Sequence, residues 1–186
     1  MVDAQRLAVL VDGFDCGADM AASKSKELIL GLLKGTPAPF NRSQYIPGHI
    51  TGTGLILHPS QEAILLVFHR RLERWLLPGG HVEKEDATAE DTARREVFEE
   101  TGAHFAESGI LVGMDVHGIP PSSRQPYHLH HDLVFGFRAL SDVVRPTEEV
   151  RDARWYSIDE LTKGKPQVPL SVLECAKRAL LLVPLL

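Results

Sequence analysis

The sequence predicts a fold of the α/β class, because segments with strand patterns and segments with helix patterns are interleaved along the chain. Residues 49–57 alternate and are rich in Ile, Thr and Gly, and residues 64–68 form a short apolar run, so a pair of strands is predicted there. An acidic stretch that ends at Gly102 and the C-terminal stretch 168–183 both predict helices. The chain has 186 residues, enough for one domain with a full core.

The N-terminal part, residues 1–45, is expected to be a small helical extension of the main domain, residues 46–186. Two short helices are predicted by apolar residues at helical spacing, namely Leu7, Leu10, Val11 and Phe14, and then Leu28, Leu32 and Leu33. Gly35, followed by two prolines, marks the end of the second helix. The extension is expected to pack on the main domain, and a dimer contact or a cap over a substrate is the alternative.

Charge and composition narrow the class of protein. The chain has 20 basic and 25 acidic residues, a formal net charge of −5, and 44% hydrophobic residues. This mild acidity argues against a general nucleic-acid or membrane-surface binder, which would carry a basic patch. Cys16 and Cys175 lie far apart and fit no metal spacing, and the N-terminus lacks the pattern of a signal peptide. A cytoplasmic protein with reduced, buried thiols is therefore expected.

The stretch 79–102 combines a glycine turn with an acidic helix. Thr88, with Asp91 three residues later, has the form of a capping box, and Gly102 stands where a helix commonly ends in a left-handed turn. Residues 75–81, directly before the helix, predict a short apolar strand that ends in Pro-Gly-Gly. Paired glycines let the backbone bend sharply or come close to a ligand.

Three carboxylates of this helix share one face. Glu96, Glu99 and Glu100 follow the spacing i, i+3, i+4. Like charges at this spacing repel each other by about 0.2–0.5 kcal/mol per pair on an exposed helix. A hard divalent cation, which prefers oxygen ligands, would relieve that repulsion. A solvated amphipathic helix is the alternative, but the adjoining glycine turn favours a metal and phosphate site.

The segment resembles the Nudix box, Gly-x5-Glu-x7-Arg-Glu-(aliphatic)-x-Glu-Glu-x-Gly-(aliphatic). Gly80 matches the first glycine, and residues 95–102 match the second half, with Ala103 as a small stand-in for the last aliphatic residue. The middle Glu is replaced by Asp86, and eight residues instead of seven separate it from the box arginine. The loop is therefore one residue longer, as in a Gly-Gly-His-Val-Glu-x-x-Asp variant of the box, which weakens any role for Asp86.

The resemblance covers residues 48–161 and implies an α/β/α sandwich with a mixed sheet between helices. It implies a Nudix-type pyrophosphohydrolase that cleaves a diphosphate linkage in a nucleoside diphosphate joined to another group. The implied cofactor is Mg²⁺, with Mn²⁺ as the alternative ion. A small nucleotide or diphosphate is the expected partner, without nucleic acid or membrane, and a homodimer stays open.

The resemblance also implies roles for particular residues. The metal would be held by the carbonyl of Gly80 and by the carboxylates of Glu96, Glu99, Glu100 and, from a later loop, Glu149, with Glu148 as second choice. Glu96 is either a third ligand or the group that accepts the proton of the attacking water. Arg95 would orient Glu96 through an ion pair. The expected catalytic residues are therefore Glu96, Arg95 and Glu99.

Arginines and histidines are the candidates for substrate contacts. Arg70 and Arg74 precede the glycine turn, and a guanidinium matches phosphate oxygens two at a time; a solvated hairpin loop is the alternative. Residues 127–137, taken as a strand, place two histidines and an aspartate on one face, and His131 with apolar side chains on the other. The polar face could contact substrate phosphate, position a water or bind a further cation, and a solvent-facing strand is the alternative. The residues expected to bind substrate are Arg70, Arg74, His81, His128, His130 and Asp132. Ordinary polar or capping roles are expected for His49, His58 and His104.

Two other functions are alternatives to hydrolysis. A nucleotide-sensing Nudix domain would bind without cleaving, but the intact Arg-Glu-x-x-Glu-Glu set counts against it, because a pure binder has no need for all these acids. An isomerase of prenyl diphosphates would need a catalytic cysteine near the site. Cys16 and Cys175 lie outside the region of resemblance, so this option ranks low.

Overall fold

The computed structural model describes residues 1–105, 107–148 and 150–184. Its strands form a seven-stranded sheet in the order β3-β2-β1-β6-β5, in which β4 also pairs with β1 and β7 with β2. The strands are β1 (Gly48–Leu57), β2 (Ala63–His69), β3 (Arg74–Leu76), β4 (Gly79–His81), β5 (Ile110–Ile119), β6 (His128–Arg138) and β7 (Val150–Ser157). The helices are α1 (Ala4–Asp12), α2 (Met20–Gly35), α3 (Ala89–Thr101), α4 (Ile158–Thr162) and α5 (Leu170–Leu182).

A parallel pair forms the centre of the sheet. β1 and β6 run in register from Gly48 opposite Leu129 to Leu57 opposite Arg138. The pairings of β1 with β4 and of β6 with β5 are antiparallel, so the sheet is mixed, as predicted. β1 and β2 form only a short hairpin around Leu57 and Ile64, because β2 pairs along its length with β7.

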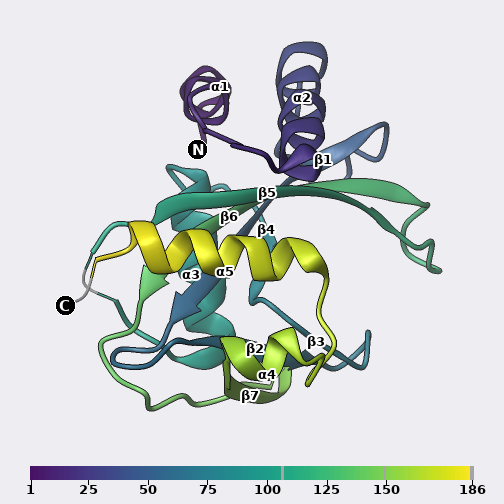
Figure 1. The fold of residues 1–186 in the computed structure, drawn as a ribbon. Helices are drawn as coiled ribbons and strands as arrows, with labels where there is room; N and C mark the ends of the chain where they lie inside the picture. The colour runs from purple at the N-terminus through teal and green to yellow at the C-terminus, as the bar shows by residue number, and fades with distance from the viewer. Residues whose placement is uncertain (106, 149, 185–186) are drawn as a thin grey trace.

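Helices cover both faces of this sheet (Figure 1). Ile50 of β1 belongs to the apolar cluster that contains Ala89 and Ala93 of α3. Leu55 and Leu57 of the same strand belong to the cluster that contains buried residues of α5. Because successive side chains of a strand point to opposite faces, α3 and α5 lie on opposite sides of β1. The predicted α/β/α sandwich is confirmed.

The capping residues that predicted the ends of α3 also define its ends in the structure. Thr88 accepts from the backbone of Asp91, and the Asp91 side chain accepts from the Thr88 backbone, which completes a capping box. Gly102 ends the helix in the left-handed conformation, with φ 64°. Two glycines of β1 let this helix come close to the sheet. A Cβ atom at Gly52 would stand 2.8 Å from the carbonyl oxygen of Ala89, and one at Gly54 would overlap Cγ2 of Val97.

The N-terminal helices pack on the same side of the sheet as α3, over β5. Val11 of α1 and Ile29 of α2 are fully buried. Both belong to the cluster that contains Leu111 and Met114 of β5. Two helices were predicted here, and the packing on the main domain agrees with the first of the alternatives considered for this extension.

α5 packs on the sheet through small side chains. Cys175, Ala176 and Ala179 are buried, whereas Leu170 at the start of the helix is 70% exposed. Small side chains let α5 lie close to β5 and β6, which a count of large apolar residues does not reveal. No helix in the described ranges is long and apolar enough to cross a membrane.

Candidate functional site

β4 places the glycine turn against α3. Gly80 lies opposite Gly52 of β1, and partners in register share a face of the sheet. Since Gly52 faces α3, Gly80 faces it too. A Cβ atom at Gly80 would overlap the carboxylate of Glu96. The glycine thus leaves room for the Glu96 carboxylate in its present position beside the β4 backbone.

The guanidinium of Arg95 joins the helix to the turn and to the loop before it. Its Nη1 donates to Oε1 of Glu96 and to Oε2 of Glu99, each at 3.0 Å. Its Nη2 donates to the carbonyl oxygen of His81 at 2.9 Å, and Nη2 and Nε donate to Asp86 at 3.0 and 3.2 Å. Partial burial opposes the charge, but the hydrogen bonds to Asp86 and Glu96 outweigh it and raise the pKa of Arg95 above its usual range.

Asp86 has a structural role, which the sequence did not predict. The residue is 4% exposed. Besides binding Arg95, it accepts from the backbone N of Glu83 at 2.9 Å and from Oγ1 of Thr92 at 2.8 Å. Burial alone would raise the pKa of Asp86, but the hydrogen bonds from these three residues outweigh it and lower the pKa. Asp86 thus anchors the longer loop to α3.

The three predicted carboxylates lie along α3, and that of Glu96 lies beside Gly80. The exposed fraction of the side chain is 13% for Glu96 and 42% for Glu99, and Glu100 is 7% exposed. Within the described ranges their carboxylate oxygens do not all lie within 4.8 Å of one another. The donors are nevertheless all oxygen atoms beside a glycine backbone, which fits a hard cation such as Mg²⁺.

The fourth carboxylate predicted to bind metal comes from the segment before β7. Glu149 lies outside the described residues, and Glu148, the second choice, is exposed just before it.

Histidines line the opposite face of the same strands. His49 of β1 lies opposite His130 of β6, and Thr51 lies opposite both His81 of β4 and Asp132 of β6. Because side chains alternate along a strand, these partners share the face that points away from α3. Three of the residues predicted to bind substrate, namely His81, His128 and His130, are therefore brought together, but on the other side of the sheet from Glu96.

Asp132 links the two central strands on this face. It is 8% exposed and accepts from Oγ1 of Thr51 and Oγ1 of Thr53, each at 2.8 Å. Burial raises the pKa of Asp132, although the neighbouring His117 and the two hydroxyl groups oppose the shift. Asp132 of β6 therefore accepts hydrogen bonds from two hydroxyl groups of β1.

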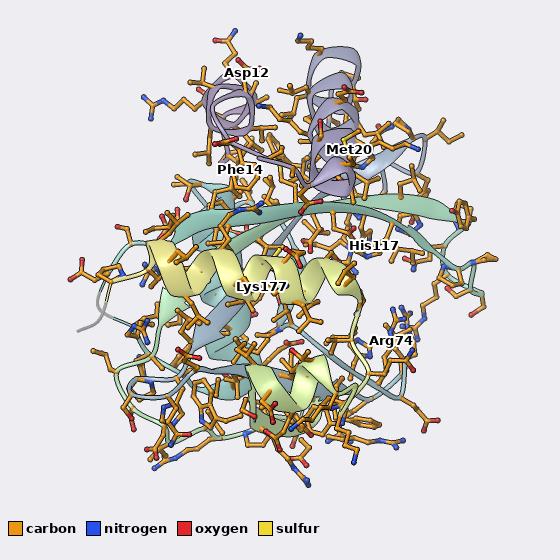
Figure 2. All side chains as sticks on the ribbon, viewed as in Figure 1. Asp12, Phe14, Met20, Arg74, His117 and Lys177 are labelled. Carbon is orange, nitrogen blue, oxygen red and sulfur yellow. The ribbon has the colours of Figure 1, made fainter. Side chains whose placement is uncertain are left out.

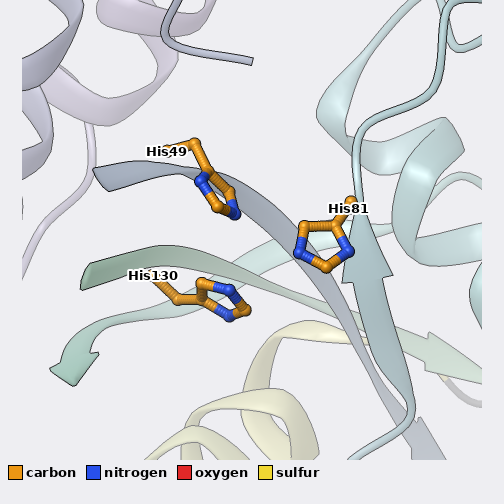
Figure 3. Close-up of side chains that lie close together, drawn as sticks. All are labelled: His49, His81 and His130. Carbon is orange, nitrogen blue, oxygen red and sulfur yellow. The ribbon is translucent and has the colours of Figure 1, made fainter. Parts of the chain in front are cut away.

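His49 belongs to this face, although the sequence analysis gave it an ordinary polar role. It is fully buried, and its ring lies 5.1 Å from that of His81, 4.9 Å from that of His130 and 5.0 Å from that of His128, between centroids. Figure 3 shows the rings of His49, His81 and His130 turned toward one another. The expectation of an ordinary role considered His49 alone, whereas the structure places its ring beside those of three other histidines.

Arg74 reaches the edge of the histidine face, where His117 of β5 lies opposite His130. His117 bonds Asp115 at 2.9 Å, which raises its pKa, and the charge of Arg74 is close enough to oppose that shift. Figure 2 shows Arg74 and His117 at the same end of the molecule. Arg70 is exposed in the turn between β2 and β3.

Comparison with known proteins decides the family. A family model described as NUDIX domain matches residues 48–176. The chain belongs to the Nudix family. The resemblance stated from the box is thereby confirmed.

Two relatives are similar in sequence to part of this Nudix chain. A putative 8-oxo-dGTP diphosphatase of Bacillus subtilis (strain 168) is 35% identical over 105 residues, which cover 55% of this chain and 62% of that protein. The NAD-capped RNA hydrolase NUDT12 of Homo sapiens is 31% identical over 121 residues, which cover 60% of this chain. The match spans only 24% of that relative's own length.

A solved structure supports the Nudix fold. A NUDIX-family hydrolase from Clostridium perfringens aligns with a TM-score of 0.53 at 21% identity, over 72% of this chain and 97% of that chain. The family match extends to residue 176 and so includes Cys175, which the sequence analysis placed outside the resemblance. Burial raises the pKa of the Cys175 thiol to about 12, and the side chain packs between α5 and β5. Cys175 is therefore a core residue of the Nudix domain, and a thiol with such a raised pKa does not have the properties of a catalytic nucleophile.

Proposed function

We propose that this chain hydrolyses a diphosphate linkage in a nucleoside diphosphate derivative, with a divalent cation, Mg²⁺, bound at α3. The observation that carries the proposal is that the Glu96 carboxylate occupies the space a Cβ atom at Gly80 would need, while Arg95 bonds both Glu96 and Glu99. A solvated helix has no need of this arrangement, which joins box residues from a strand, a loop and a helix around an all-oxygen donor set.

The residues divide into ligands and positioning groups. Glu99, Glu100 and the Gly80 carbonyl are the proposed metal ligands, with Glu149 as a further ligand from the later loop. Mg²⁺ at this place would neutralise phosphate oxygens and lower the pKa of a bound water. Glu96, bonded by Arg95 and lying beside Gly80, is the proposed acceptor of the water proton or a third ligand. Arg95 positions Glu96 and is itself anchored by Asp86.

Cationic and polar groups at the sheet edge are the proposed substrate contacts. Arg74, with Arg70 behind it, would pair with phosphate oxygens. His81, His128, His130 and Asp132 remain the proposed polar contacts on the face away from α3, and the exposed edge near His117 extends that set. A net charge of −5 favours a small nucleotide, held by local contacts, over a nucleic acid or a membrane surface. Two free cysteines agree with the proposed cytoplasmic setting.

A panel of phosphoanhydrides tests the activity. The purified chain would be incubated with Mg²⁺ or Mn²⁺ and with nucleotide sugars, dinucleoside polyphosphates, NADH, coenzyme A and nucleoside triphosphates. We expect phosphate-containing products from at least one of them, with none when the divalent cation is removed by a chelator. Saturable binding of a nucleotide without products would contradict hydrolysis and support the nucleotide-sensing alternative.

A further inference from the structure

The strand register brings three imidazoles from three strands to one point. His49 of β1 is in register with His130 of β6, and His81 of β4 is in register with Thr51, two residues further along β1. The centroids of the three rings lie 4.9–5.2 Å apart, which is close to an equilateral triangle. One ring nitrogen from each residue lies within 4.8 Å of the others. In Figure 3 a nitrogen of each ring faces the space between the three.

Hydrogen bonding leaves one nitrogen of His49 as a buried lone pair. Nδ1 of His49 lies 3.1 Å from the carbonyl oxygen of Gln44, which can only accept, so the proton sits on Nδ1. Nε2 of His49 is then an acceptor, and it is buried without a hydrogen-bond partner among the described residues, as is Nε2 of His130. Buried polar atoms without partners are uncommon in folded proteins. An imidazole whose outer N–H is fixed by a carbonyl is the usual arrangement of a metal-bound histidine.

The surroundings keep these imidazoles neutral. Burial lowers the pKa of His49, and burial together with the neighbouring histidines lowers the pKa of His130 far below its usual range. A neutral imidazole is the form that binds a metal, so no proton has to be displaced at neutral pH.

We propose that His49, His81 and His130 form a second cation site, which binds Zn²⁺ and is separate from the carboxylates of α3. Zn²⁺ takes imidazole nitrogens at about 2.0–2.1 Å in tetrahedral geometry, which sets two of them about 3.3 Å apart, so a modest turn of the rings completes the site. Mg²⁺ prefers oxygen ligands and would stay with the carboxylates. Three histidines leave a fourth position for an oxygen ligand, such as water or a phosphate oxygen.

The sheet itself separates the two sites. Adjacent residues of β4 point to opposite faces, so Gly80 faces Glu96 while His81 faces the histidines. Arg95 connects the two sites, because its side chain bonds the carboxylate of Glu96 and its Nη2 donates to the backbone carbonyl oxygen of His81. Substitutions can therefore remove one site while the other keeps its ligands.

Metal content tests the proposal independently of turnover. The full chain, prepared without a polyhistidine tag, would be equilibrated with Zn²⁺ in a large excess of Mg²⁺, and metal bound per chain would be measured after removal of free ions. We expect one tightly held Zn²⁺ per chain and, with Co²⁺ in its place, the visible absorption of a four-coordinate Co²⁺ imidazole site. Bound Zn²⁺ is also expected to raise the unfolding temperature.

Matched variants assign the bound ion to its ligands. His130→Gln, at a half-buried position, and His49→Gln are expected to abolish Zn²⁺ binding and the Co²⁺ spectrum. His104→Gln, at an exposed position, and Glu99→Gln are expected to keep both. If His49→Gln does not fold, His130→Gln alone decides. The proposal is overturned if the wild-type chain takes up no Zn²⁺ in excess Mg²⁺, if His130→Gln still binds it, or if Glu99→Gln loses it.

Discussion

At the scale of single residues, Arg95 and Asp86 hold the Nudix box together. Their side chains are 20% and 5% exposed, so the ion pair lies largely out of water. Removing one partner of such a pair leaves an uncompensated charge, at a cost of about 3–5 kcal/mol for a fully buried pair. Because Arg95 also bonds Glu96 and Glu99, the same pair fixes the carboxylates that the proposed reaction needs.

Asp86→Asn is expected to destabilise the fold at neutral pH and to differ less from the wild type in acid. The folded-state pKa of Asp86 lies below its unfolded value of about 3.9, so the unfolded chain takes up the proton first as the pH falls. The contribution of Asp86 is therefore complete above the unfolded pKa and is lost as the pH falls through the folded pKa. Denaturant unfolding between about pH 3 and about pH 7 measures the difference.

Asp142→Asn is the matched control, since Asp142 is exposed. Its unfolding free energy should follow that of the wild type at each pH. A gap between Asp86→Asn and the wild type that stays constant over the whole range would show that the charge of Asp86 is not what stabilises the fold.

At the scale of elements, the site depends on how closely α3 lies on β1. Gly54 lies under Val97, one residue beyond Glu96. Gly54→Ala would push the helix away from the strand, and overpacking of this kind typically costs about 1–3 kcal/mol. The unfolding temperature should fall, and kcat on any substrate found should fall as well, because Glu96 moves relative to Gly80. Thermal unfolding and steady-state kinetics measure the two effects.

Gly31→Ala provides the control for Gly54→Ala. Gly31 lies in α2, and an added Cβ atom there would meet nothing within 4 Å. The substitution should stabilise the helix by about 0.5–1 kcal/mol and leave kcat unchanged. Equal stability and activity of Gly54→Ala and the wild type would refute the close docking of α3.

Elements defined by local signals were predictable, and those defined by distant contacts were not. The capping box at Thr88 and the stop at Gly102 gave the bounds of α3, because both act within one helical turn. The packing of α5 on glycine-containing strands through small residues such as Ala176 and Ala179 had no local signal, because those strands are distant in the sequence. The pairing of β4 with β1 also had no local signal, because it joins residues far apart in the sequence.

At the scale of the whole molecule, the N-terminal extension is part of the core. Ile29 of α2 is fully buried in the cluster that holds Leu111 and Met114 of β5. Ile29→Ala is expected to lower the free energy of unfolding by about 2–5 kcal/mol, in a single transition. Leu28→Ala, at a neighbouring position that is 44% exposed, should cost much less. A separate early transition in Ile29→Ala would mean that the extension unfolds alone.

The pairing of distant strands explains which site residues could not be predicted from the sequence. A family resemblance gave the sandwich and the acids of α3, because the box is one continuous segment. The histidine face was predicted only in part. His128 and His130 alternate within one strand, but His49 and His81 join them through pairings of β1 with β6 and with β4. No local pattern fixes such a register.

The central claim is that the carboxylates of α3 hold the cation that drives hydrolysis. The most direct test is the turnover of Glu99→Gln and Glu100→Gln with Mg²⁺ on a substrate that the wild type cleaves, with circular dichroism to verify folding. Both variants are expected to stay folded and to lose turnover, because an amide oxygen replaces a charged ligand. Near wild-type turnover by either folded variant would contradict the claim.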